Sequence, residues 1–77
     1  MKPTVRYDPD ADAAKITLSD NAYLESEEVA PGIILDFDAE GRMIGIEVLQ
    51  ARSRLAADTL SSAEPPRAQD VFVIEKA

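Results

Sequence analysis

The side chains of this sequence best suited to chemistry are carboxylates grouped around its turns. Residues 36–47 read D-F-D-A-E-G-R-M-I-G-I-E. This nearly matches the calcium-binding loop, which has oxygen ligands at positions one, three, five and twelve and a glycine at position six. The pattern predicts one alternative function for the chain, a divalent-cation-binding domain. Its ligands would be Asp36, Asp38, Glu40 and Glu47.

The surroundings of this segment argue against a calcium loop. Such a loop lies between two helices, whereas the residues on both sides of this turn alternate between apolar and polar types as in β-strands. Alternation also sends Glu47 away from the turn that holds Asp38 and Glu40. A second acidic turn, D-P-D-A-D at residues 8–12, has no glycine or glutamate in register. We expect that second segment to be a solvated hairpin turn in which aspartate accepts hydrogen bonds from nearby backbone N–H groups, and a divalent-cation site on residues 8–12 is the alternative.

The composition excludes most familiar enzyme classes. The chain has 77 residues, enough for one small domain, and contains neither cysteine nor histidine. It therefore lacks a cysteine nucleophile, a thiolate zinc site and the commonest general base. Motifs for a nucleophile elbow, a phosphate-binding loop or a dinucleotide site are missing as well. Carboxylate pairs for glycoside hydrolysis need a substrate cleft, and these acids crowd on hydrated hairpins. We expect no enzymatic activity and no cofactor.

Charge is distributed unevenly along the chain and indicates which partners it attracts. Fifteen acidic and eight basic residues give a net charge of −7, and residues 1–50 hold eleven of the acids but only four of the bases. Such a field repels nucleic-acid phosphates and anionic lipids and attracts a basic polypeptide. We expect no nucleic-acid partner and no membrane partner. No apolar stretch approaches the length of a membrane helix or a signal-peptide core, so we expect a cytoplasmic protein.

Apolar and polar residues alternate along much of the first fifty residues, which is typical of strands with one buried face. The alternation covers residues 5–8, 15–19 and 44–48. Residues 23–29 and 33–37 predict two more strands, separated by the turn sequence A-P-G. Five consecutive strands with short connections predict an antiparallel meander. The predicted core lies on one face of the sheet and comprises Val5, Tyr7, Ile16, Leu18, Leu35, Phe37, Ile44, Ile46 and Val48.

The remaining residues predict one helix, a loop and a last strand. Residues 50–60 contain good helix formers with apolar residues spaced three and four apart, so they predict a helix packed on the sheet. The polar segment 61–70 holds two prolines and predicts a loop, and V-F-V-I-E at 71–75 predicts a short C-terminal strand. The fold class is therefore α+β: an antiparallel β-meander of about five strands with one helix on one face and a short C-terminal strand. One β-rich domain spans residues 1–60, and the terminal strand occupies 71–77.

Two parts of the strand region resemble each other at a constant offset of 30 residues. Residues 6–18 and 36–48 each contain an aromatic residue followed by aspartate, then a turn, then an alternating strand, and Tyr7 aligns with Phe37. Two interpretations stay open. Any two acidic hairpins look alike, or a duplicated hairpin gives the sheet a pseudo-two-fold axis.

Two surfaces are candidates for partner binding. Glu25, Glu27 and Glu28 form a charged face that discourages sheet-to-sheet aggregation if the strand lies at an edge, and that also suits a basic partner. A small core favours self-association, so we also expect a homodimer that buries the apolar last strand. That second surface consists of Val71, Phe72, Val73 and Ile74. The predicted function is therefore protein–protein interaction by a small acidic domain.

Two stretches of the sequence resemble a known family. They read Y-D-P-D-A-D-A-A-K-I-T-L-S-D and S-E-E-V-A-P-G-I-I-L-D-F-D-A-E-G-R-M-I-G-I-E-V-L-Q-A, and the likeness covers about Val5 to Leu55. They are similar to the short prokaryotic proteins grouped as domain of unknown function 2283. The resemblance implies a small β-rich domain with no established activity, substrate or cofactor, and it brings no functional residues. Members are often encoded beside a second small protein suspected of being a toxin, so the resemblance also implies an antitoxin-like partner role.

Overall fold

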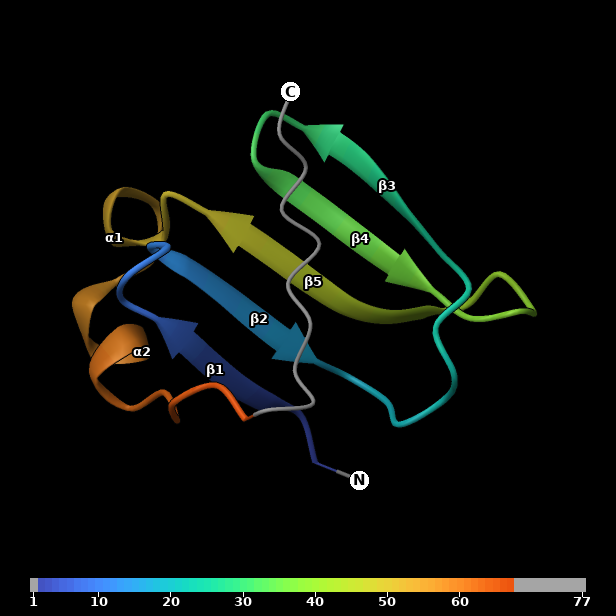
Figure 1. Cartoon of the computed structure of the whole chain (residues 1–77), viewed down its shortest axis with the longest axis horizontal. Coiled ribbons are helices and arrows are strands. Elements are labelled where there is room, and N and C mark those ends of the chain that lie inside the picture. Colours follow the sequence, from blue (N-terminus) through green and yellow to red (C-terminus); the bar gives the residue numbers. More distant parts are fainter. Residues whose placement is uncertain (1, 68–77) are drawn as a thin grey trace.

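The computed structural model describes residues 2–67, which form a five-stranded sheet and two short helices (Figure 1). In chain order the elements are β1 (Thr4–Asp8), β2 (Ala13–Thr17), β3 (Glu25–Ala30), β4 (Ile33–Phe37), β5 (Met43–Leu49), α1 (Ala51–Arg54) and α2 (Ala57–Ser61). All five strands predicted from the sequence are confirmed. Neither helix in this part of the chain has the length and apolar content needed to cross a bilayer.

The strand order is β1-β2-β5-β4-β3, and every neighbouring pair is antiparallel. The predicted meander is wrong at one connection, because residues 18–24 carry the chain from β2 to the far edge of the sheet and β5 returns to pair with β2 (Figure 1). β5 is the longest strand, and its Gly45 and Glu47 are buried along with apolar residues on the other face. A strand buried on both faces needs backbone partners on both sides, so β5 lies in the centre.

The pairing register reproduces the 30-residue offset seen in the sequence. Val5 pairs with Ile16 in the first hairpin, and Leu35 pairs with Ile46 in the second. Ile16 and Ile46 then pair with each other between β2 and β5. The two hairpins are thus related by a pseudo-two-fold axis between β2 and β5, the arrangement that a duplicated hairpin predicts. A register shift near the end of β4 interrupts the correspondence.

The sheet has one apolar face and one mixed face. A row of paired residues crosses the apolar face: Val5, Ile16, Ile46 and Leu35. A buried cluster of Ala14, Val48 and Ala51 lies at the end of this face where the helices pack (Figure 1). Of the nine predicted core residues, Ile44 and Val48 are buried and the other seven are half-buried. Among residues 2–67 the two short helices pack at this end of the face, through Leu55 and Leu60.

The single helix predicted over residues 50–60 is instead two short helices separated by extended backbone at Leu55 and Ala56. The reason lies in the spacing of the two leucines that pack against the core cluster, Leu55 and Leu60. Residues five apart point about 140° apart around a continuous helix, so one helix would not turn both side chains towards the sheet. The extended break resets the phase and lets both leucines reach the core.

The chain after α2 runs beside β1. Glu64 forms an isolated parallel bridge with Arg6, and residues 65–67 have no helix or strand. The C-terminal strand predicted at 71–77 lies outside the described residues. So does the homodimer contact predicted through Val71–Ile74, which stays a prediction.

Candidate functional site

The negative charge of the chain is concentrated in one stretch. Between Ile16 and Gly41 there are seven acidic residues and no lysine or arginine, while the eight acidic residues elsewhere are balanced by eight basic ones. This stretch contains β3 and β4, and β3 carries three glutamates at one edge of the sheet. The excess negative charge of the chain therefore falls within the stretch that includes β3 and β4.

β3 is an edge strand of the sheet that residues 2–67 form. Among residues 2–67 it pairs with β4 alone (Figure 1). Five of its six residues are exposed, the exception being Ser26. An edge of this kind presents backbone N–H and C=O groups that can pair with another extended chain. β3 is thus the described element best placed to contact a partner.

The three glutamates predicted to bind a partner are not equivalent. Glu28 lies on the mixed face, and its Oε2 atom accepts a hydrogen bond from the Gly32 N–H at 3.0 Å. Glu25 and Glu27 lie on the apolar face. Within the described part of the chain their two carboxylates make no hydrogen bond or ion pair. Glu28 therefore closes the β3–β4 turn, whereas the exposed Glu25 and Glu27 carboxylates have no hydrogen-bond or ion-pair partner among residues 2–67.

Polar contacts on the inner side hold β3 in place. Ser26 Oγ donates a hydrogen bond to Asp36 Oδ1 at 2.7 Å, and the Tyr23 hydroxyl lies 2.9 Å from Ser26 Oγ. Asp36 is buried beside Gly45, where a Cβ would come within 3.2 Å of Asp36 Oδ2. Glycine at this position leaves room for the buried carboxylate, and the carboxylate anchors the edge strand.

Large apolar side chains flank the glutamates of β3. Tyr23 and Leu24 precede the strand and are 54% and 59% exposed, and Val29, at the irregularity near its end, is 50% exposed. The sequence does not single out these residues, because scattered exposed apolar residues are common on protein surfaces. Here they lie at both ends of one open strand, where a chain paired along β3 would cover them.

The carboxylates of the calcium-loop pattern are dispersed. Asp36 and Glu47 are buried on the mixed face, and Glu47 pairs across the sheet with Lys15, whose positive charge disfavours a cation nearby. Glu40 is exposed in the β4–β5 turn. Among residues 2–67 no three His, Cys, Asp or Glu side chains gather as a possible metal site.

Asp38, the fourth of these carboxylates, closes the β4–β5 turn. Its Oδ1 atom accepts hydrogen bonds from the backbone N–H groups of Arg42 at 2.9 Å and Glu40 at 3.0 Å, and its Oδ2 atom accepts one from Asn21 Nδ2 at 3.0 Å. These bonds, chiefly the one from Arg42, lower the pKa of Asp38. Asp8 closes the equivalent β1–β2 turn by accepting a backbone N–H at 3.0 Å, as predicted.

A second polar cluster ties the β1–β2 hairpin to α1. Asp12 Oδ1 accepts hydrogen bonds from the Tyr7 hydroxyl at 2.7 Å and from the Arg52 backbone N–H at 3.0 Å, and Arg52 Nη1 donates to the Tyr7 hydroxyl at 3.0 Å. The bond from Tyr7 lowers the pKa of Asp12, while burial and the same bond raise the pKa of Tyr7. Sequence patterns miss this cluster because Arg52 lies 40 residues from Asp12. Its groups bind one another, so it acts as a structural joint.

The other edge of the sheet, β1, is closed by the segment that follows α2. The Glu64 N–H donates to the Val5 carbonyl and the Tyr7 N–H donates to the Glu64 carbonyl, both at 2.9 Å. Arg6, which is only 8% exposed, forms an ion pair with Glu64 Oε1 at 2.7 Å. β1 is therefore unavailable to another strand at this point.

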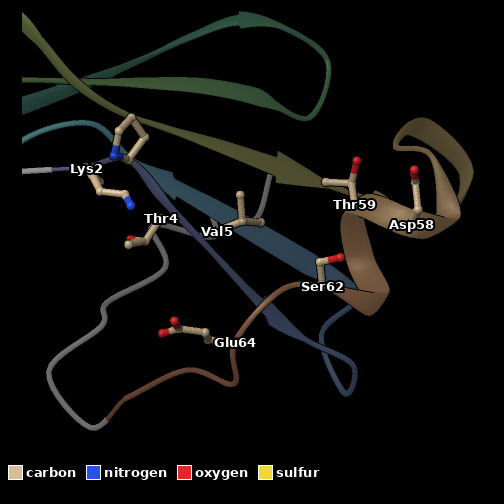
Figure 2. A pocket seen from close by; sticks show the side chains of 8 residues that line it. Lys2, Thr4, Val5, Asp58, Thr59, Ser62 and Glu64 are labelled. Carbon is tan, nitrogen blue, oxygen red and sulfur yellow. The ribbon is translucent and has the colours of Figure 1, made fainter.

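An open pocket of about 620 Å³ lies beside this closed edge (Figure 2). Its lining includes Val5 from β1, Thr59 from α2, and the charged side chains of Lys2, Asp58 and Glu64. Charges of both signs give the pocket no strong preference for a cation or an anion.

Comparison with known families matches residues 4–52 to the family described as "Protein of unknown function (DUF2283)". The match covers more than half of the chain, from the first residue of β1 into α1. The chain belongs to this family. The curated proteins gave no match, and neither did the solved structures. The DUF2283 match contains the whole five-stranded sheet and its open edge β3, whereas Glu64, which closes β1, lies outside it.

Proposed function

We propose that this DUF2283 domain is a non-enzymatic interaction module that binds a basic protein partner through β3. The observation that carries the proposal is the open acidic edge. β3 has one strand neighbour among residues 2–67, and its Glu25 and Glu27 side chains are exposed and make no contact with a counter-charge there. An exposed strand edge with unengaged carboxylates suits a partner that supplies both a backbone and positive charge.

The wider charge distribution supports a basic partner. The stretch from Ile16 to Gly41 carries seven acids without a single base, so its field extends beyond β3 itself. Such a field speeds the approach of a positively charged protein and repels nucleic acid and anionic membranes. An antitoxin-like role would be one case of this function, since a protein in that role acts by binding its partner.

Native mass spectrometry of untagged protein, isolated gently from its own host, tests the proposal. We expect a complex whose added mass belongs to a polypeptide with more basic than acidic residues. Raising the salt concentration before the measurement should weaken the complex, because exposed charges are screened over about 8 Å at physiological ionic strength. The same spectrum reports a homodimer or a bound metal as added mass.

Two double variants show whether the partner uses β3. Glu25→Lys/Glu27→Lys should lose the partner, because both attractive charges become repulsive. Asp20→Lys/Glu40→Lys changes the net charge equally at exposed positions outside β3 and should keep it. The proposal is wrong if the protein carries no partner chain, or if both variants retain the partner equally.

A further inference from the structure

We infer that the partner binds as a sixth strand beside β3, through an extended segment that carries two basic residues at alternate positions between apolar residues. This inference rests on the proposed function and adds how the partner is recognised. It follows from three features of the open edge: its backbone, the spacing of its free glutamates and the apolar residues at its ends.

The backbone supplies the first part of the recognition. β3 is regularly paired with β4 from Glu25 to Glu28, before the register shift that precedes Ala30. In an antiparallel sheet alternate residues of a strand turn their N–H and C=O groups to opposite sides, so part of this segment faces outward. Strand addition at such an edge is a common mode of peptide recognition. On β1, Glu64 takes the Val5 carbonyl and the Tyr7 N–H.

The free glutamates set the pattern of basic residues. Glu25 pairs with Phe37 and Glu27 pairs with Leu35, so both glutamates lie on the same face. Their spacing along the strand is about 6.5 Å, and a neighbouring strand places side chains about 5 Å from those directly opposite. Lysine or arginine at two alternate positions therefore meets one glutamate each. Glu28 does not call for a third basic residue, because it lies on the other face of the sheet and accepts a hydrogen bond from the Gly32 N–H.

The apolar residues at the ends of β3 indicate which residues of the partner lie on either side of its two basic residues. Leu24 lies at one end of the strand and is 59% exposed, and Val29 lies near the other end and is 50% exposed. The Leu24 N–H donates to the Phe37 carbonyl at 2.8 Å, so the backbone at Leu24 already lies against β4. Apolar residues of the partner, before and after its two basic residues, would lie beside Leu24 and Val29 and remove apolar surface from water.

A second copy of β3 does not fit this pattern. Two antiparallel copies would place glutamates opposite glutamates, and like charges directly opposite each other destabilise a sheet. No lysine or arginine lies between Ile16 and Gly41 to relieve the repulsion. The segment that fits β3 therefore belongs to a different, basic protein.

The first test uses the blocked peptide Val-Thr-Lys-Thr-Lys-Thr-Val as a probe of the full chain, with binding followed by NMR shifts of backbone amides. We expect shifts at Glu25–Val29 and none along β1. A peptide with glutamate in place of both lysines should bind at least about tenfold more weakly, because two cross-strand pairs change from attraction to repulsion. Shifts confined to another surface, or no binding by the lysine peptide, would overturn the inference.

Two N-methylated forms of the lysine peptide separate strand addition from charge attraction. One form carries methyl groups on the backbone nitrogens of both lysines, and the other carries them on the backbone nitrogens of the threonines. Each form blocks one edge of the extended peptide and leaves its charge unchanged. We expect one form to lose binding and the other to keep it. Equal binding by both forms would overturn strand addition while leaving the proposed function intact, since charge attraction does not depend on which edge is blocked.

Variants of the protein complete the test. Glu25→Lys/Glu27→Lys should bind the lysine peptide about tenfold more weakly and should prefer the glutamate peptide. Asp20→Lys/Glu40→Lys, with the same net charge, should bind both peptides as the native chain does. If both double variants weaken binding equally, the peptide senses overall charge and the strand pairing is wrong. The native complex then decides the proposed function separately.

Discussion

The two edge strands of the sheet, β1 and β3, differ in what lies against their outer sides. β1 shares two backbone hydrogen bonds with Glu64, and Arg6 forms an ion pair with the same residue. Among residues 2–67 no strand or bridge pairs with the outer side of β3, which carries exposed glutamates instead. Within residues 2–67 the chain therefore closes the outer side of β1 with its own backbone, while no described strand pairs with the outer side of β3.

Charge on an open edge has two effects. Glutamates repel a second copy of the same strand, and the irregularity at Val29 shortens the regular edge, so both features discourage sheet-to-sheet aggregation. For a basic strand the same repulsion becomes attraction. The protective role of Glu25 and Glu27 and their proposed binding role are thus two consequences of one surface.

Disrupting the closed edge should have the largest effect on stability. We expect Arg6→Ala to lower the free energy of unfolding by about 1–3 kcal/mol, because it removes a nearly buried guanidinium bonded to Glu64 and to the Pro65 carbonyl. Glu25→Ala at the open edge should change the free energy of unfolding by less than about 0.5 kcal/mol. Urea denaturation measures both values, and equal losses would remove the contrast between the edges.

Removing the hydrogen bond between Ser26 and Asp36, which holds β3 to β4, should have a smaller effect on stability. Ser26→Ala removes a hydrogen-bond donor from the buried Asp36 carboxylate, so we expect a loss of about 1 kcal/mol and faster amide exchange along β3. Ser62→Ala, at an exposed position that ends α2, is the matched control and should leave both measurements unchanged. If β3 exchanges no faster in the Ser26 variant, Asp36 does not anchor it.

Acidification should weaken the hydrogen bonds that two aspartates, Asp12 and Asp38, accept. Asp12 joins the first hairpin to α1 and Asp38 closes the turn beside β4, and each has a folded pKa below the ordinary value of 3.8. A lowered folded pKa stabilises the fold above about pH 4, and this contribution is lost as the pH falls through the folded pKa. Asp38→Asn should therefore be less stable at neutral pH and lose less stability on acidification.

Thermal melting between neutral pH and about pH 3 checks this expectation. Asp20→Asn is the control, because Asp20 is exposed in the loop before β3, and its acid dependence should match that of the native chain. An Asp38→Asn variant with the native acid dependence would show that this carboxylate does not contribute to acid sensitivity.

Added divalent cations should have the smallest effect. We expect millimolar calcium or magnesium to leave Tm unchanged, because Asp38 accepts backbone N–H groups and Lys15 pairs beside Glu47. Occupation of a real site at a hundred times its Kd would add about 2.7 kcal/mol. A rise in Tm that Asp38→Asn abolishes would support the alternative cation-binding function.

The strands were predictable from sequence, but their order was not. Alternation reports burial within each strand, which is a local property. It located three of the strands, and the A-P-G turn separated the other two. Alternation does not report which strands become neighbours, so the pairing of Lys15 with Glu47 between β2 and β5 was missed. The helix prediction failed for a related reason: spacing identifies helical residues but not the break at Leu55 that turns two leucines to one surface.

The candidate site was predictable only as a charged strand. The glutamates of β3 are evident in the sequence, and so is their suitability for an edge. Which of them are free is decided by the register with β4 and by the bond between Glu28 and the Gly32 N–H. That Leu24 and Val29 lie at the ends of the same open edge also depends on strand order, which no local pattern carries.

Amide hydrogen exchange of the full chain, with and without the lysine peptide, tests the central claim most directly. In the free protein the outward amides of Glu25–Glu28 should exchange faster than the Tyr7 amide, which bonds to the Glu64 carbonyl at 2.9 Å. Adding the peptide should slow exchange along β3 and leave β1 unchanged. Protection of all β3 amides in the free protein, or protection by the peptide at a different surface, would contradict the account of β3 as an open edge that receives a basic strand.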